Sequence, residues 1–152
     1  LCAEQRWFED FVIGERASFG YEWTLVELEA PSHRLFNRSG DPSAALNHAI
    51  RQIIDWRTWL SLNRRVAEDD FPARGMGLKG INPNTAGLII MGRRKDVDPA
   101  DNERRVALMH AHNVEIRTFD WLVEVVDARL PYMKRIGRRG SDGTSPDRSD
   151  PV

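Results

Sequence analysis

The spacing of apolar and polar residues predicts two short strands, at residues 8–14 and 22–30. Both segments are rich in aromatic and β-branched side chains, which suit a pleated sheet. Residues 15–20 lie between them and are bounded by Gly14 and Gly20, which favour a turn. The pattern therefore predicts an antiparallel hairpin in this region.

A longer segment has the period of a helix. Apolar residues recur at steps of three and four from Leu46 to Leu60, which predicts one apolar helix face. Asp41 or Ser43 is suited to cap the helix at its start. The polar character of the sequence around Asn63 predicts that the helix ends there.

The remainder of the chain alternates between further strands and helices. A glycine- and proline-rich stretch at 64–85 predicts a long loop. Its glycines at 75–80 predict a flexible segment, which is expected to lie near bound DNA. The elements expected after it are a buried strand at 86–91, a helix at 98–112, a strand at 114–117 and a helix at 119–129. This order predicts a mixed α/β fold in a single domain.

Composition limits the classes of protein that the chain can represent. With 152 residues, 41% hydrophobic and 30% charged, it predicts a globular domain over 1–135, followed by a disordered tail over 136–152. Cys2 is the only cysteine, which excludes an internal disulfide and fits a cytoplasmic protein. No apolar run is long enough to predict a membrane span. Because the sequence starts at Leu1 and not at methionine, we expect it to be part of a longer protein.

The overall charge gives no general attraction to nucleic acid. Lys and Arg together number 22 against 23 Asp and Glu, for a net charge of −1. DNA binding would therefore need a local basic patch, for which Arg93 and Arg94 are candidates. A solvated surface is an equally good interpretation of these arginines.

Acidic residues on the two predicted strands are the main candidates for chemistry. Asp10 lies in the first strand, and Glu27 and Glu29 share one face of the second, because side chains alternate along a strand. Carboxylates grouped in this way can hold Mg²⁺ or Mn²⁺ against a phosphodiester. Leu28 between them is expected to point into the core. Spacing alone favours a simpler interpretation, in which the glutamates form the solvated face of an edge strand.

The long helix offers two further candidates beside this acidic group. His48 and Gln52 are four residues apart and therefore lie on one face of the helix. Gln52 can orient a carboxylate or a water molecule, and His48 can contact a phosphate. Taken alone, Gln52 is better explained as a residue at the boundary of the core, and His48 as a buried or boundary histidine. The four histidines lack zinc-like spacing, so a structural zinc site is not expected.

Several motifs, in one order, resemble the Shedu family of bacterial anti-phage proteins. The resemblance covers roughly residues 8–130. It is carried by four segments, Val26-Glu-Leu-Glu-Ala-Pro31, Leu35-Phe-Asn-Arg-Ser-Gly-Asp-Pro-Ser43 with Asn47 to Leu60, Leu88-Ile-Ile-Met-Gly-Arg93, and Val114-Glu-Ile-Arg-Thr-Phe-Asp-Trp-Leu122.

The family implies a restriction-endonuclease-like fold of the PD-(D/E)XK class, with a mixed sheet flanked by helices. It also implies metal-dependent DNA cleavage with Mg²⁺ or Mn²⁺, and assembly into a homo-oligomer. By position, Asp10 matches the first acid of the motif and Glu27 the second, and both are expected metal ligands. Gln52 resembles the helix glutamine that related nucleases place near the metal.

Glu29 departs from the pattern of this class, which usually has a lysine two residues after the second acid. An ionised glutamate cannot donate the hydrogen bond that a lysine would. Glu29 can serve as a general base or a further metal ligand. The alternative is that it marks an inactive copy of the fold that binds DNA ends or a partner protein. The sequence thus supports two hypotheses, a deoxyribonuclease and a non-catalytic binding module.

Overall fold

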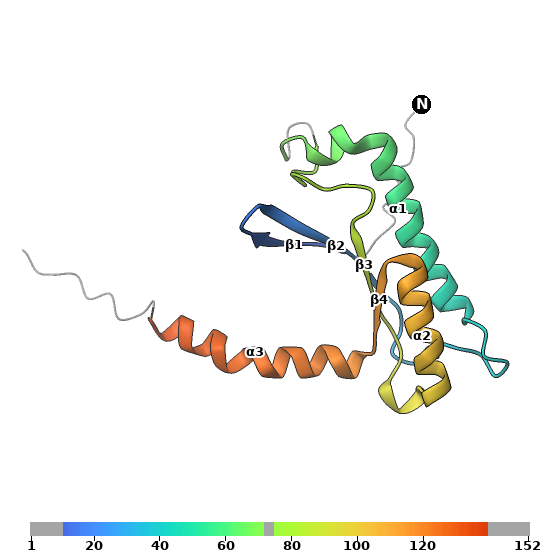
Figure 1. The fold of residues 1–152 in the computed structure, drawn as a ribbon. Coiled ribbons are helices and arrows are strands. Elements are labelled where there is room, and N and C mark those ends of the chain that lie inside the picture. Colours follow the sequence, from blue (N-terminus) through green and yellow to red (C-terminus); the bar gives the residue numbers. More distant parts are fainter. Residues whose placement is uncertain (1–10, 72–74, 140–152) are drawn as a thin grey trace, which may run out of the picture. The chain divides into compact units, whose positions relative to one another are not determined.

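The computed structural model describes residues 11–71 and 75–139, with side chains described up to residue 129. Four strands form one sheet in the order β1-β2-β3-β4 (Figure 1). Strand β1 is antiparallel to β2, and the remaining neighbours are parallel, which confirms the predicted mixed α/β fold. The strands are β1 (Phe11–Ala17), β2 (Gly20–Leu28), β3 (Ala86–Ile90) and β4 (Val114–Arg117).

The helices connect these strands and extend beyond them. They are α1 (Ala44–Glu68), the short 3-10 helix η1 (Arg94–Asp96), α2 (Pro99–His112) and α3 (Phe119–Arg139). The sheet, α1, η1 and α2 belong to one compact unit that ends at Phe119. Residues from Asp120 onward form a second unit, so α3 is described by itself.

Two helix starts agree with the sequence analysis. The Ser43 hydroxyl accepts the amide hydrogen of Leu46 at 3.1 Å and caps α1. The Asp98 carboxylate caps α2 by accepting the amide hydrogen of Asp101 at 2.7 Å. Each side chain thereby satisfies a first-turn donor that has no acceptor within its helix.

Three helix and turn boundaries differ from the prediction. Asn63 has non-helical torsion angles and kinks α1, but the helix continues to Glu68. Helix α3 runs to Arg139, so the expected end at 129 is wrong, and the predicted domain boundary at 135 falls inside it. The part of the predicted tail from residue 140 lies outside the described residues. The hairpin turn is also shorter, with Ser18 and Phe19 between the two strands.

The glycine-rich stretch after α1 is held by backbone hydrogen bonds. Met76 and Leu78 donate to the carbonyls of Val66 and Ala67, at 3.1 and 2.8 Å. The indole nitrogen of Trp23 donates to the Lys79 carbonyl at 2.8 Å. This stretch packs against the end of α1 and against β2, contrary to the flexible loop expected from its glycines.

Helix α1 covers one face of the sheet. The strand register places Leu25 beside Gly87, and Glu27 beside Ile89, on that face. Ile53 of α1 lies close enough to Gly87 to contact an added Cβ at 3.0 Å. Both parallel connections move in the same direction across the sheet, and right-handed crossovers then place α1 and α2 on one side (Figure 1). The core forms between these helices and this face.

Arg57 of α1 ties the helix to the segments that lead into β3 and β4 at one end of the sheet. Its guanidinium donates to the carbonyls of Thr85, His112 and Asn113 at 3.0, 2.6 and 2.7 Å. These carbonyls precede β3 and β4, so a single side chain fixes where both parallel strands start. Charge-assisted bonds of this kind are stronger than neutral ones.

We expect Arg57→Met to lower the free energy of unfolding by about 2–3 kcal/mol, because the thioether keeps the stem but supplies no donor to the three carbonyls. Urea denaturation followed by circular dichroism measures this loss. Arg51→Met, at an exposed position of the same helix, is the matched control and should change stability by less than about 0.5 kcal/mol. Equal losses in the two variants would contradict a tethering role.

Candidate functional site

Strand β2 presents Glu27 to helix α1 and not to solvent. It lies between β1 and β3, so the interpretation of an exposed edge strand is wrong. Glu27 is only 3% exposed and lies on the covered face, in register with Ile89. Leu28, expected in the core, is 37% exposed because it points to the other face. Moving a carboxylate out of water and into the interior costs free energy, so its presence on this face suggests a functional reason.

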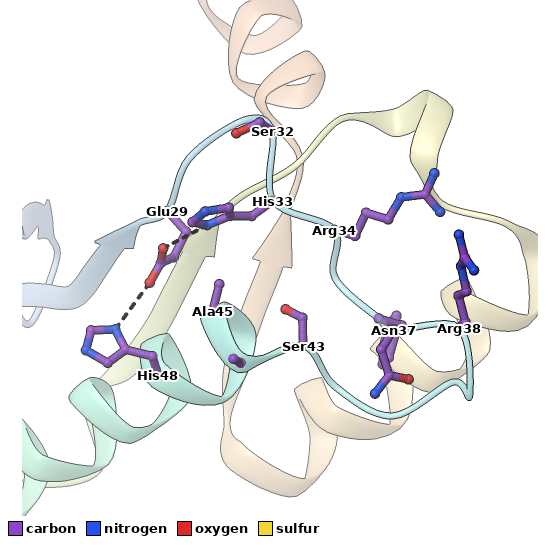
Figure 2. A pocket seen from close by; sticks show the side chains of 11 residues that line it. Glu29, Ser32, His33, Arg34, Asn37, Arg38, Ser43, Ala45 and His48 are labelled. Carbon is purple, nitrogen blue, oxygen red and sulfur yellow. Dashed lines mark hydrogen bonds and ion pairs between the residues drawn. The ribbon is translucent and has the colours of Figure 1, made fainter.

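Glu29, which follows β2, joins two histidines. Its Oε2 lies 3.2 Å from Nδ1 of His33, and its Oε1 lies 3.2 Å from Nδ1 of His48 (Figure 2). An ionised carboxylate can only accept hydrogen bonds, so both Nδ1 atoms must donate. In a neutral ring the Nε2 atom is then left as the proton acceptor. Glu29 thereby fixes the tautomer of both histidines.

The position of His33 depends on a turn that follows β2. The His33 amide donates to the Ala30 carbonyl at 3.0 Å, which closes the turn. Gly92, after β3, lies directly against this turn with a φ of +67°, and a Cβ added to it would be 2.7 Å from the His33 carbonyl oxygen. Only glycine fits such a position without strain.

An open pocket of about 990 Å³ lies between this turn and the start of α1. Figure 2 shows the Glu29 carboxylate and both histidines at one end of it. The cap residue Ser43 and the first-turn residues Ala44 and Ala45 line the pocket as well. Arg34 and Arg38 come from the loop before the helix. Acidic, basic and hydroxyl groups therefore surround one space that is open to solvent.

The other predicted site residues lie in several places. Gln52 lies one helical turn beyond His48 and is half-buried, while His48 is exposed at the pocket. Arg93 and Arg94 are exposed at the start of η1 and do not line this pocket. Asp10 lies outside the described residues, so its predicted role stays a prediction. Of the predicted set, the structure brings Glu29 and His48 into direct contact.

A comparison with protein families matches residues 3–123 to the C-terminal part of the Shedu protein SduA. The chain belongs to the Shedu family. The match spans most of the chain, including the whole sheet, α1 and α2. The Shedu family is one of anti-phage defence proteins, as the resemblance of the motifs implies. A search of curated proteins finds no match to the chain.

In this Shedu domain, the residues around Glu29 only partly fit a divalent metal. Carboxylate oxygens are the donors that Mg²⁺ prefers, and one or two of them suffice when substrate phosphate completes the shell. Glu27 and Glu29 supply such oxygens, although both oxygens of Glu29 contact histidines. Within residues 11–71 and 75–129, no group of three His, Cys, Asp or Glu side chains is arranged to hold a metal ion. Glu27 is therefore the better candidate ligand of the two.

Sequence reasoning missed His33, Arg34 and Arg38 as residues of this pocket in the Shedu domain. A signal existed for His33, which lies four residues after Glu29 across the Ala-Pro step. The arginines gave no signal, because their placement depends on the folded loop.

Among the helices that the structure describes, none has both the length and the apolar character to cross a membrane.

Proposed function

We propose that this chain is the metal-dependent DNA endonuclease domain of an anti-phage defence protein, with a restriction-endonuclease-like fold of the PD-(D/E)XK class. The observation that carries the proposal is the buried carboxylate of Glu27 on an interior strand, two residues from the pocket residue Glu29. Membership of the Shedu family supports the same conclusion. The resemblance also leads us to propose a cytoplasmic homo-oligomer that acts on DNA.

In this proposal, Glu27 and Asp10 hold Mg²⁺ or Mn²⁺, and Gln52 orients the site from α1. When bound, such a metal would polarise the phosphodiester and favour its hydrolysis. Phe11, which follows Asp10 in the sequence, pairs with Val26, which precedes Glu27. This register supports the pairing of the two acids in one site.

Glu29 assists from the position where the class usually has a lysine. Its carboxylate holds His33 and His48 through their Nδ1 atoms, which leaves each Nε2 able to accept a proton. Once protonated, Nε2 would donate to a phosphate oxygen and so supply the donor that a glutamate lacks. A protonated histidine at this point would also attract the charge of a phosphodiester.

Metal dependence is the direct test. The protein should relax or linearise supercoiled plasmid DNA in Mg²⁺ or Mn²⁺, and should leave it intact in EDTA and in Ca²⁺, which is larger and coordinates more loosely. Gel electrophoresis of the plasmid over time gives the rate. Plasmid that stays supercoiled in both metals, or cutting that continues in EDTA, would contradict the proposal.

One observation favours a second function, that of a non-catalytic module that binds DNA ends or a partner protein. Both oxygens of Glu29 are engaged by histidines, an arrangement that holds the turn after β2 in place whether or not any metal binds. This module would bind DNA equally well with and without a chelator and would not cut it. The plasmid assay therefore separates the two functions.

A further inference from the structure

Two arginines line the pocket on the side away from the Glu29 carboxylate. Arg34 and Arg38 extend from the loop that precedes α1, and Figure 2 shows both of them separated from the Glu29 end. Both side chains are exposed. Neither forms a hydrogen bond or an ion pair within the part of the chain that the structure describes. Their charge is thus available to a ligand.

The loop that carries these arginines is ordered by its own hydrogen bonds. The Asn37 side-chain oxygen accepts from the Ser39 amide at 3.0 Å, the Ser39 hydroxyl at 2.8 Å and the Asp41 amide at 2.9 Å. The loop is anchored on either side of this turn, because Leu35 and Phe36 are buried and the Ser43 amide donates to the Leu35 carbonyl at 2.9 Å. Arginines on a preformed loop lose less entropy when a ligand binds.

Among the described residues that line the pocket, Glu29 is the acidic one, and it lies at the opposite end from the arginines. Asp41 of the loop lies 2.8 Å from the Ser39 hydroxyl and does not line the pocket. Asp101 of α2 pairs with Arg104 at 3.0 Å, and the Arg104 guanidinium lies against Gly40 on the same loop. The first turn of α1 contains no acidic residue. The arginine end of the pocket therefore has a local positive charge, although the chain as a whole has a net charge of −1.

We propose that Arg34 and Arg38 form a subsite for a phosphate of the DNA backbone other than the phosphate that is cleaved. The planar guanidinium group matches the paired oxygens of a phosphodiester. A strand that crosses the pocket would meet the arginines at one end and the Glu29–histidine group at the other. This inference rests on the proposed function, because it assigns the pocket to the same DNA strand that is cut.

The test measures binding without cleavage. The affinity for a fluorescent DNA duplex is followed by anisotropy in Ca²⁺, over a series of salt concentrations. We expect the double variant Arg34→Ala/Arg38→Ala to bind about 10-fold or more weakly. The slope of log affinity against log salt should become flatter by about 1, because the contact with one phosphate is lost. In the cleavage assay, the same variant should raise KM more than it lowers kcat.

Arg16→Ala/Arg51→Ala is the matched control, because it removes the same charge at two exposed arginines that do not line the pocket. It should keep nearly the affinity and the salt slope of the unmodified protein. Equal weakening in both double variants would overturn the subsite, and so would a failure of the unmodified protein to bind DNA. Binding that depends on Arg34 and Arg38 without any cleavage would contradict the nuclease and leave the subsite standing.

Discussion

Glu27→Gln is expected to reduce the rate of DNA cleavage by more than about 100-fold, because removal of residues that only support a metal ligand already costs 10–100-fold. The amide has nearly the shape of the carboxylate but carries no charge to hold a divalent cation. The same change should leave the free energy of unfolding nearly unchanged, since the amide keeps the shape of the buried side chain and can still form hydrogen bonds. Lost activity with retained stability is typical of a residue kept for function.

Two measurements on one preparation test this expectation, the plasmid cleavage rate and the urea midpoint. Glu22→Gln is the matched control, because Glu22 is exposed on the same strand and should behave as the unmodified protein in both measurements. A Glu27→Gln variant that cuts DNA at the normal rate would exclude Glu27 as a metal ligand. A variant that loses activity together with stability would indicate a structural role for the carboxylate instead.

Gly92→Ala is expected to lower the free energy of unfolding by about 3–4 kcal/mol, because two costs combine. A non-glycine residue at a φ of +67° is strained by at least about 1 kcal/mol. The added methyl group would also lie 2.7 Å from the backbone oxygen of His33, and such overpacking typically costs about 1–3 kcal/mol. The turn must shift to relieve this contact, so His33 should lose its hydrogen bond to Glu29.

Gly80→Ala separates the two costs. Gly80 has a similar φ of +78°, but nothing lies within 4 Å of an added Cβ. This variant should lose only about 1 kcal/mol and should keep full activity. Chemical denaturation of both variants gives the difference, and cleavage kinetics report the disturbance of the turn. Equal stability losses would show that the contact with His33 does not restrict residue 92.

The helices and strands could be predicted from local chemistry. Which face of the sheet is buried could not. Ser43 and Asp98 start helices because their oxygens satisfy first-turn amides, which the sequence pattern predicts. Period-two alternation likewise shows that Glu27 and Glu29 share a face. It does not show which face a helix covers, and here the covered face carries the acids while Leu28 faces away. Packing overrode the usual preference of leucine for the interior.

The pocket could be predicted only in part, because its walls come from distant parts of the chain. His48 was found through its helical spacing from Gln52. His33 required the turn after β2, whose shape depends on Gly92, nearly sixty residues later. Arg34 and Arg38 required a loop that is organised by the Asn37 side chain. Contacts of this range have no signature in the spacing of residues along one sequence.

The backbone angle of Gly40 has a consequence for how the family can vary. Gly40 has a φ of +85°, and an added Cβ would lie 2.5 Å from the Arg104 guanidinium carbon. The guanidinium is the far end of a flexible side chain and can move aside, so the backbone angle is the stricter barrier at this position. In Shedu sequences, position 40 should therefore be limited to glycine and the few residues that tolerate a left-handed backbone, such as asparagine, whichever side chain stands at position 104.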